Sequence, residues 1–335
     1  MKDSIKNKVD LLVTNRAKIE KEFKWGYNLM NIAAALVFSA ADKEADIEKL
    51  KECREILKKN TSAFSVFRDT SEAVIASKMV LADDPEQYLK DVKFIYDKLS
   101  KNRMFDSSFL IQGAISIYEA GRMDDTDMII EKYTELFKKM GKKHPILTSS
   151  DDIVFVILLA MTEKSVDRIF DEIEECYTYL KKEIKLKVGS DELQGLGEIL
   201  ALSDGDIKVK SDKVVKLYNT IKEHGVKWGN EYNEFAALGT LIDTSSVVDV
   251  DENALVDEIV EVSDYLKTIK GFGDWSLDSK QRLLFSAMLV GDSYSDNSAV
   301  LSSSTINSTV AMVIAEEVAI MMCIMICVTS ANAAD

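Results

Sequence analysis

The residues best suited to move protons at neutral pH are two histidines in this 335-residue sequence, His144 and His224. Each stands near the end of an expected helix, just before a connecting loop, where a cation suits the negative end of the helix dipole. A metal site would need further histidine or cysteine residues nearby in the sequence, and none is present. We therefore expect both histidines to be structural, and we expect no cofactor or metal.

Acidic residues are numerous, and one group of them resembles the start of a calcium-binding loop. Asp249, Asp251 and Asn253 follow the pattern D-x-D-x-N. The position after them should suit glycine and the twelfth should be glutamate, but Ala254 and Val260 stand there, so the pattern fails. No G-x-x-x-x-G-K-[ST] phosphate-binding loop occurs. We expect the acids to cap helices and face solvent, and a hydrolase built on paired carboxylates stays open as the alternative.

Aromatic residues recur at the junctions between the expected helical units. The candidate partner-binding residues are Trp25, Trp228, Tyr232, Phe272 and Trp275. One interpretation is packing between neighbouring units. The other is a row of aromatic side chains along one edge, where a peptide or a helix of a partner could dock, because aromatic anchors carry much of the energy of protein interfaces.

The composition indicates a globular protein made of helices. Hydrophobic residues make up 47% of the chain and charged residues 30%, which excludes a disordered chain. Two prolines and fourteen glycines are too few for the turns of a sandwich or barrel of short strands. The net charge of −15 repels phosphate backbones, so we expect no nucleic-acid partner. Four cysteines without a disulfide spacing, and an N-terminal segment without an apolar signal region, predict a cytoplasmic protein.

One two-helix unit recurs along the chain with a period of about 41 residues. Its amphipathic helix places an aromatic residue three positions before a large aliphatic one; these aromatic residues are Tyr96, Phe137, Tyr177 and Tyr218. An apolar helix alternates with it, and its last leucines keep the same period at Leu159, Leu200 and Leu241. This pattern is typical of HEAT-class α-solenoids. The sequence predicts an atypical opening unit, five full pairs and a final half-pair at 278–290.

The two helices of each unit differ in the surroundings that they require. Residues 86–100 carry a single apolar stripe with charged residues opposite, which predicts a helix with one face toward water. Residues 153–161 are apolar without interruption, which predicts a helix covered on several sides. Asp84 before Pro85 predicts a helix start. Three glycines are expected to follow helix ends directly: Gly141, Gly225 and Gly271.

Four segments in this order resemble one known family: EFKWGYNLMNIAAAL, LTSSDDIVFVILLA, LQGLGEILAL and KGFGDWSLDSKQRLLFSAMLV. The family is the set of bacterial proteins catalogued as domain of unknown function 4003, and the resemblance covers roughly residues 20–292. It implies an all-helical cytoplasmic protein. It implies no activity, cofactor or catalytic residue.

We therefore predict an all-α protein in which residues 1–292 form an α-solenoid, a HEAT-like right-handed superhelix of stacked helix hairpins. Residues 293–308 are expected to be a Ser/Asn-rich spacer, and residues 309–335 a hydrophobic C-terminal helix that caps the open end of the solenoid. Residues 309–328 are long enough to span a bilayer, but two glutamates there would cost on the order of 2–3 kcal/mol each. We expect no membrane contact, and an oligomer contact is the remaining alternative.

The leading functional prediction is a non-catalytic protein-binding or scaffolding solenoid, because stacked pairs form a long concave surface. The first alternative is an enzyme or small-ligand protein with a pocket between the apolar helices. Charged residues inside those helices would favour it, and few are present: Lys78, Glu198, Glu234 and Arg282. The second alternative is a membrane-tethered adaptor, which depends on residues 309–328.

Overall fold

The computed structural model describes residues 1–23, 28–101, 108–228, 234–242 and 251–292. Every regular element in these ranges is a helix, and they contain no strand. The prediction of an all-α protein is therefore confirmed for the described part of the chain. The predicted spacer and C-terminal helix, residues 293–335, lie outside it.

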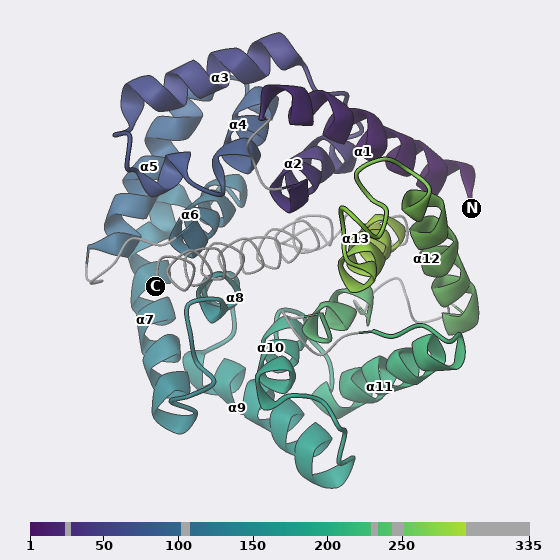
Figure 1. Cartoon of the computed structure of the whole chain (residues 1–335). Coiled ribbons are helices and arrows are strands. Elements are labelled where there is room, and N and C mark those ends of the chain that lie inside the picture. The colour runs from purple at the N-terminus through teal and green to yellow at the C-terminus, as the bar shows by residue number, and fades with distance from the viewer. Residues whose placement is uncertain (24–27, 102–107, 229–233, 243–250, 293–335) are drawn as a thin grey trace, which may run out of the picture.

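The helices form an outer and an inner series that alternate along the chain (Figure 1). The outer series is α1 (Asp3–Glu22), α3 (Ile47–Asn60), α5 (Pro85–Ser100), α7 (Thr126–Lys143), α9 (Val166–Thr178), α11 (Ile207–Glu223) and α12 (Glu252–Lys267). The inner series is α2 (Asn28–Ala40), α4 (Glu72–Leu81), α6 (Ser108–Glu119), α8 (Asp152–Ala160), α10 (Ser190–Leu200), the 3-10 helix η4 (Ala236–Ile242) and α13 (Ser279–Asp292). Short helices lie between them: η1 (Val66–Arg68), η2 (Met123–Asp125) and the π-helical η3 (Tyr179–Glu183).

The apolar pattern of each helix decides the series to which it belongs. In α5 the buried residues are the predicted stripe: Tyr88, Leu89, Val92, Ile95, Tyr96 and Leu99. In α8 every residue is buried, from Asp152 to Ala160. An outer helix can stay in water on its polar face, whereas an inner helix of this composition needs neighbours on all sides.

The packed pairs begin with the outer helix. The contacts within pairs join α1 to α2, α3 to α4, α5 to α6, α7 to α8, α9 to α10, α11 to η4, and α12 to α13. The described residues thus form seven complete pairs, and the predicted half-pair and atypical opening unit were wrong. The period alone cannot tell which of two alternating connections lies inside a pair, and α1 was not included in the predicted pairs.

The last pair contacts the first, so the row of helices closes into a ring. Figure 1 shows α1, in purple, beside α12 and α13, in green. Helix α1 packs on α13, and the Lys2 ammonium lies 3.0 Å from the Glu258 carboxylate of α12. Asn28, at the start of α2, donates from Nδ2 to the carbonyl oxygens of Gly271 and Ser276, at 2.9 Å each.

The two ends of the described row of helices are in contact, whereas the predicted capping role assumed an open end of the solenoid. The rotation between successive pairs decides whether a row of helix pairs stays open or closes, and side-chain packing sets that rotation. The predicted capping role of residues 309–335 lies outside the described residues.

Helix starts follow the predicted capping pattern more closely than helix ends do. Asp84, Asp206 and Asp251 each accept a hydrogen bond from a backbone N–H of the first helical turn. Gly225 directly follows the C-cap of α11 with a φ of 74°, as predicted. Gly141 instead lies inside α7, and Gly271 lies beyond the C-cap of α12, in the turn that leads to α13.

We predict that Gly271→Ala lowers the free energy of unfolding by about 1–3 kcal/mol. Gly271 has a φ of 93°, and an added Cβ would lie 2.0 Å from the Arg16 guanidinium carbon at the ring closure. The matched control is Gly141→Ala, where nothing lies within 4 Å of the new methyl group and the helix gains up to about 1 kcal/mol. Urea unfolding followed by circular dichroism measures both, and equal effects would contradict the role of Gly271.

Candidate functional site

The three described residues of the predicted aromatic set, Trp228, Phe272 and Trp275, do not share one surface. Trp228 and Phe272 are buried, and the Trp228 indole N–H donates to the Glu234 carbonyl oxygen at 2.6 Å. Trp275 is fully exposed. Trp25 and Tyr232 lie outside the described residues. Among the described members of the set, Trp275 is thus the one whose side chain a partner could reach.

Trp275 lies in the turn 270–278, here called the seam turn, where the two ends of the ring meet. Helices α1 and α2 hold this turn through its backbone. The Arg16 guanidinium donates to the Lys270 carbonyl oxygen at 3.4 Å, and Asn28 binds two further carbonyl oxygens of the turn. Phe272 has no exposed surface and holds the turn against the core. Its ring centroid lies 5.7 Å from the Arg16 guanidinium carbon.

Helix α13 holds the seam turn from its other side. The buried Arg282 donates to the Phe272 carbonyl oxygen at 3.0 Å and to the Asp274 carboxylate at 2.8 Å. Lys267 of α12 lies 3.0 Å from the same carboxylate. Hydrogen bonds from Lys267 and then Arg282 lower the pKa of Asp274. Four helices therefore fix the residues around Trp275, so the indole projects into solvent from a rigid turn.

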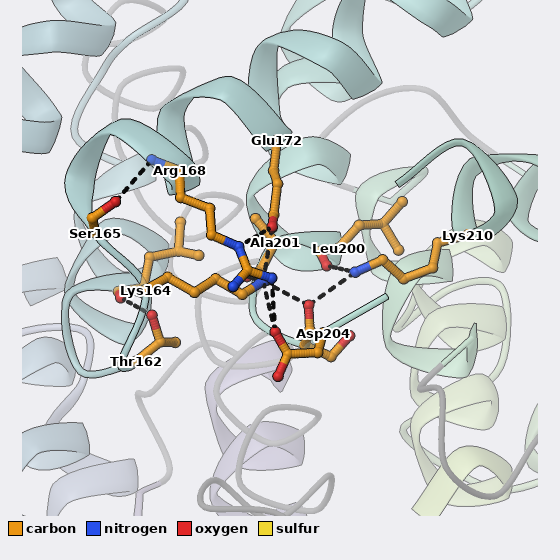
Figure 2. A network of polar contacts seen from close by, with 11 residues as sticks. Thr162, Lys164, Ser165, Arg168, Glu172, Leu200, Ala201, Asp204 and Lys210 are labelled. Carbon is orange, nitrogen blue, oxygen red and sulfur yellow. Dashed lines mark hydrogen bonds and ion pairs between the residues drawn. The ribbon is translucent and has the colours of Figure 1, made fainter. Parts of the chain in front are cut away.

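A second polar cluster lies where the inner helices α8 and α10 end (Figure 2). The Lys164 ammonium lies 2.7 Å from the Glu172 carboxylate and donates to the carbonyl oxygens of Ala201, at 2.8 Å, and Ser203, at 2.7 Å. Lys210 donates to the Leu200 carbonyl oxygen and, at 2.9 Å, to that of Ser203. Two lysines therefore share the carbonyl groups that α10 leaves unpaired at its end.

Sequence reasoning missed this lysine cluster as a candidate site. Burial, and then the charge of Lys164, lower the pKa of Lys210 to about 8. An amine with such a pKa can serve as a nucleophile or a base. Lys210 is only 2% exposed, however, and its amine already binds two carbonyl oxygens. The arrangement fits a helix cap, since cations stabilise helix C-termini.

At three successive inner helices, a basic residue at or after the end of one helix reaches the end of the next, and it binds either a carboxylate or a carbonyl oxygen there. Lys78 of α4 binds Glu119 at the end of α6, at 2.7 Å. Arg122 donates to the Met161 carbonyl oxygen after α8, at 3.0 Å, and Lys164 reaches the end of α10. The sequence did contain a signal, because a basic residue stands near the end of each of three successive apolar helices. Capping rules describe contacts within one helix, so they did not predict that these residues bind the next one.

A third polar group consists of two acids between α8 and α10. Asp152 and Glu198 are 5% and 0% exposed. Burial, and then the charge of Asp152, raise the pKa of Glu198 well above its usual value. Asp152 accepts the Ser149 backbone N–H at 2.7 Å. Sequence analysis placed Asp152 among the capping acids and noted Glu198 as a rare charged residue in an apolar helix. The repeat of about 41 residues gave no indication that Asp152 and Glu198 lie near each other.

The histidines lie where the sequence placed them, at helix ends. His144 and His224 are the C-caps of α7 and α11. The His144 imidazole lies 2.7 Å from Glu174 of α9, and that of His224 lies 3.1 Å from Asp257 of α12. Each imidazole therefore joins one outer helix to the next. Within the described residues, no group of three or more histidine, cysteine, aspartate or glutamate side chains is arranged to hold a metal ion.

Comparison with known proteins finds one family. The model of the family described as "Protein of unknown function (DUF4003)" matches residues 15–319. No curated protein matches this sequence, and no solved structure matches this fold. A search of the described residues for a helix long and apolar enough to cross a membrane finds none, and the predicted hydrophobic stretch 309–328 is not among them.

We predict that Lys164→Met lowers the free energy of unfolding by about 2–4 kcal/mol, because it leaves Glu172 without its buried cation and the Ala201 carbonyl oxygen without its donor. It should also raise the pKa of Lys210, since a like charge is removed. NMR titration of the lysine side chains measures that pKa, and chemical unfolding measures the stability. Lys138→Met, at an exposed position of α7, is the control. An unchanged Lys210 pKa would contradict the prediction.

Proposed function

We propose that this chain, which belongs to the DUF4003 family of proteins of unknown function, is a non-catalytic protein-binding scaffold built as a ring of helices. The observation that carries the proposal is the seam turn, which holds a fully exposed tryptophan in a fixed position. An indole in water is costly to leave uncovered, and tryptophan is enriched among residues that dominate binding energy.

Rigidity of the seam turn supports this use of Trp275. A binding side chain that is already ordered loses less conformational entropy when its partner arrives. Arg16, Asn28 and Arg282 fix the backbone on both sides of the indole. Lys267 and Lys270 flank the turn in the sequence. We infer a partner that offers an apolar pocket for the indole, with acidic groups at the edge of that pocket.

The proposal excludes catalysis by the ionisable clusters because their polar atoms already have structural roles. The lysine cluster caps α10. Asp152 accepts the Ser149 backbone N–H, and Glu198 accepts a hydrogen bond from the Gln194 amide. All four side chains are less than a tenth exposed. An enzyme would need one of these clusters to open toward a substrate.

We also infer that the helix pairs are copies of one unit and that the protein works in the cytoplasm. The period of about 41 residues supports the first inference. The second is supported by the free thiols of Cys53 and Cys176, both buried. Burial is the main cause that raises the pKa of each thiol to about 11, so neither is a reactive thiolate at neutral pH.

We predict that Trp275→Ala weakens partner binding at least about tenfold, through loss of a hot-spot contact, without changing the unfolding midpoint. A photo-crosslinking amino acid at position 275, introduced in the native cell, should capture the partner, and binding of wild type and variant to that partner is then compared by calorimetry. Phe64, fully exposed in another loop, provides the matched controls: crosslinking from position 64 and Phe64→Ala.

Capture of the same proteins from positions 275 and 64, or equal affinities for wild type and Trp275→Ala, would contradict the proposed site. A small molecule that stays bound to the purified protein and depends on Asp152 or Glu198 would instead favour the alternative of a ligand-binding protein.

A further inference from the structure

Two turns that each lead from an outer to an inner helix lie side by side. One follows α7, and the other follows α9 and the π-helical η3. The His144 ring, at the end of α7, has its centroid 4.9 Å from that of the Tyr177 ring on α9. The Lys181 ammonium of η3 lies 4.7 Å from the centroid of the same Tyr177 ring. The two turns therefore form one surface, here called the double turn and defined as residues 142–147 and 181–187.

The double turn is basic, although the chain as a whole is acidic. It contains six lysines and one glutamate, whereas the net charge of the whole chain is −15. Some of these lysines are exposed, and their ammonium groups form no ion pair or hydrogen bond with other described residues; they are Lys142, Lys182, Lys185 and Lys187.

The acids in this region are fewer than the lysines, and two of them are already bound. Glu174 lies 2.7 Å from His144, and Glu183 lies 3.9 Å from Lys208. Asp191, in the first turn of α10, adds one further acid. Even with these three acids, six lysines leave an excess of positive charge at the double turn.

The first of the two turns presents an isoleucine to solvent on a closed backbone. Ile146 is 92% exposed, and Pro145 restricts the backbone before it. The His144 carbonyl oxygen accepts the backbone N–H groups of Leu147, at 3.2 Å, and Thr148, at 3.1 Å. The Leu147 side chain packs against the core. Ile146 therefore keeps its apolar surface in water on an ordered turn, which favours contact with a partner.

The second turn holds a lysine in a strained backbone conformation. Lys185 has a φ of 56°, in the left-handed region where glycine is usual at helix ends because a side chain is strained there. The Leu186 N–H donates to the Leu180 carbonyl oxygen at 3.0 Å across this position. Ile184, beside it, is 39% exposed. Backbone strain and π-helical turns are both typical of functional positions.

We propose that the double turn docks an acidic segment of a partner protein. Carboxylates of that segment pair with the free lysines, and its apolar side chains cover Ile146 and Ile184. Figure 1 shows α7 across the ring from α12, which leads into the seam turn. The double turn is therefore a second binding surface, and it does not depend on the site proposed at Trp275. Two separate surfaces are what a scaffold needs to hold two partners.

The charges next to the double turn favour a protein segment over an anionic bilayer. Helix α9, which leads into the second turn, carries the exposed acids Asp171 and Glu175. A bilayer is an extended surface and would also come near such acids, which repel it within a Debye length of about 10 Å. A short segment can stay within the basic surface.

The test titrates the full-length 15N-labelled protein with a short synthetic peptide of glutamates and leucines. The peptide should shift the backbone amide signals of residues 142–149 and 181–188 until they saturate. Two reference peptides, one of lysines and leucines and one of glutamates and serines, should bind at least about tenfold more weakly. Raising the ionic strength from about 0.05 M to about 0.3 M should also weaken binding of the first peptide.

Two charge variants separate the double turn from a general attraction between charges. Lys142→Glu/Lys185→Glu should weaken binding of the glutamate–leucine peptide at least about tenfold. Lys49→Glu/Lys59→Glu, at exposed positions of α3, changes the net charge equally and should keep the affinity within about twofold of wild type. Trp275→Ala should also bind the peptide as wild type does, which distinguishes this surface from the seam turn.

The map of shifted signals in the wild-type chain decides the question even if a variant fails to fold. Absence of peptide binding would overturn the proposal, and so would shifts spread equally over another lysine-bearing turn, such as 57–62. Equal weakening in the two charge variants would also overturn it. Binding of wild type to phosphatidylglycerol vesicles without binding to the peptide would overturn it in favour of a membrane surface.

Discussion

The ring depends on one buried cation, the Arg16 guanidinium, because no covalent bond joins its first pair of helices to its last. This group binds Asn28 and Glu20 beside it and the Lys270 carbonyl oxygen across the closure. A buried guanidinium must be paired with hydrogen-bond acceptors. Without them, the free-energy cost of removing it from water would exceed the stabilisation that its contacts provide. The seam turn supplies one of these acceptors, the Lys270 carbonyl oxygen, and Gly271 leaves the room that the guanidinium needs. Closure and the presentation of Trp275 therefore have the same physical cause.

Electrostatics also joins neighbouring outer helices around the ring. A cation in the second half of one helix repeatedly meets an acid in the first turn of the next: Lys98 with Asp127, Lys139 with Asp167, and Lys216 with Glu252. The position of the acids suits the helix dipole, because each stands in the first turn of its helix. Exposed ion pairs of this kind contribute little each, about 0–1 kcal/mol. Burial of the apolar faces supplies the main stabilisation, and the ion pairs favour one register between helices.

The candidate sites divide according to how local their determinants are. Helix caps at Asp84 and Asp206 could be predicted because a side chain there binds a backbone group two or three residues away. Sequence reasoning could not predict that Phe272 is buried while Trp275, three residues later, is exposed. This difference depends on Arg16 and Asn28, which lie some 250 residues away in the sequence. The pair Asp152 and Glu198 was missed for the same reason: each residue alone resembles an ordinary capping or buried acid.

The amino-acid sequence by itself determined that the protein is all-α, which helices are outer or inner, and where most helices begin. These properties follow from apolar periodicity and capping, which act within a few residues. Only the tertiary structure decided how the helices pair, that the row closes, and which ionisable groups meet inside it. Those outcomes depend on the small rotation between neighbouring pairs, which accumulates over the whole chain and has no local signal in the sequence.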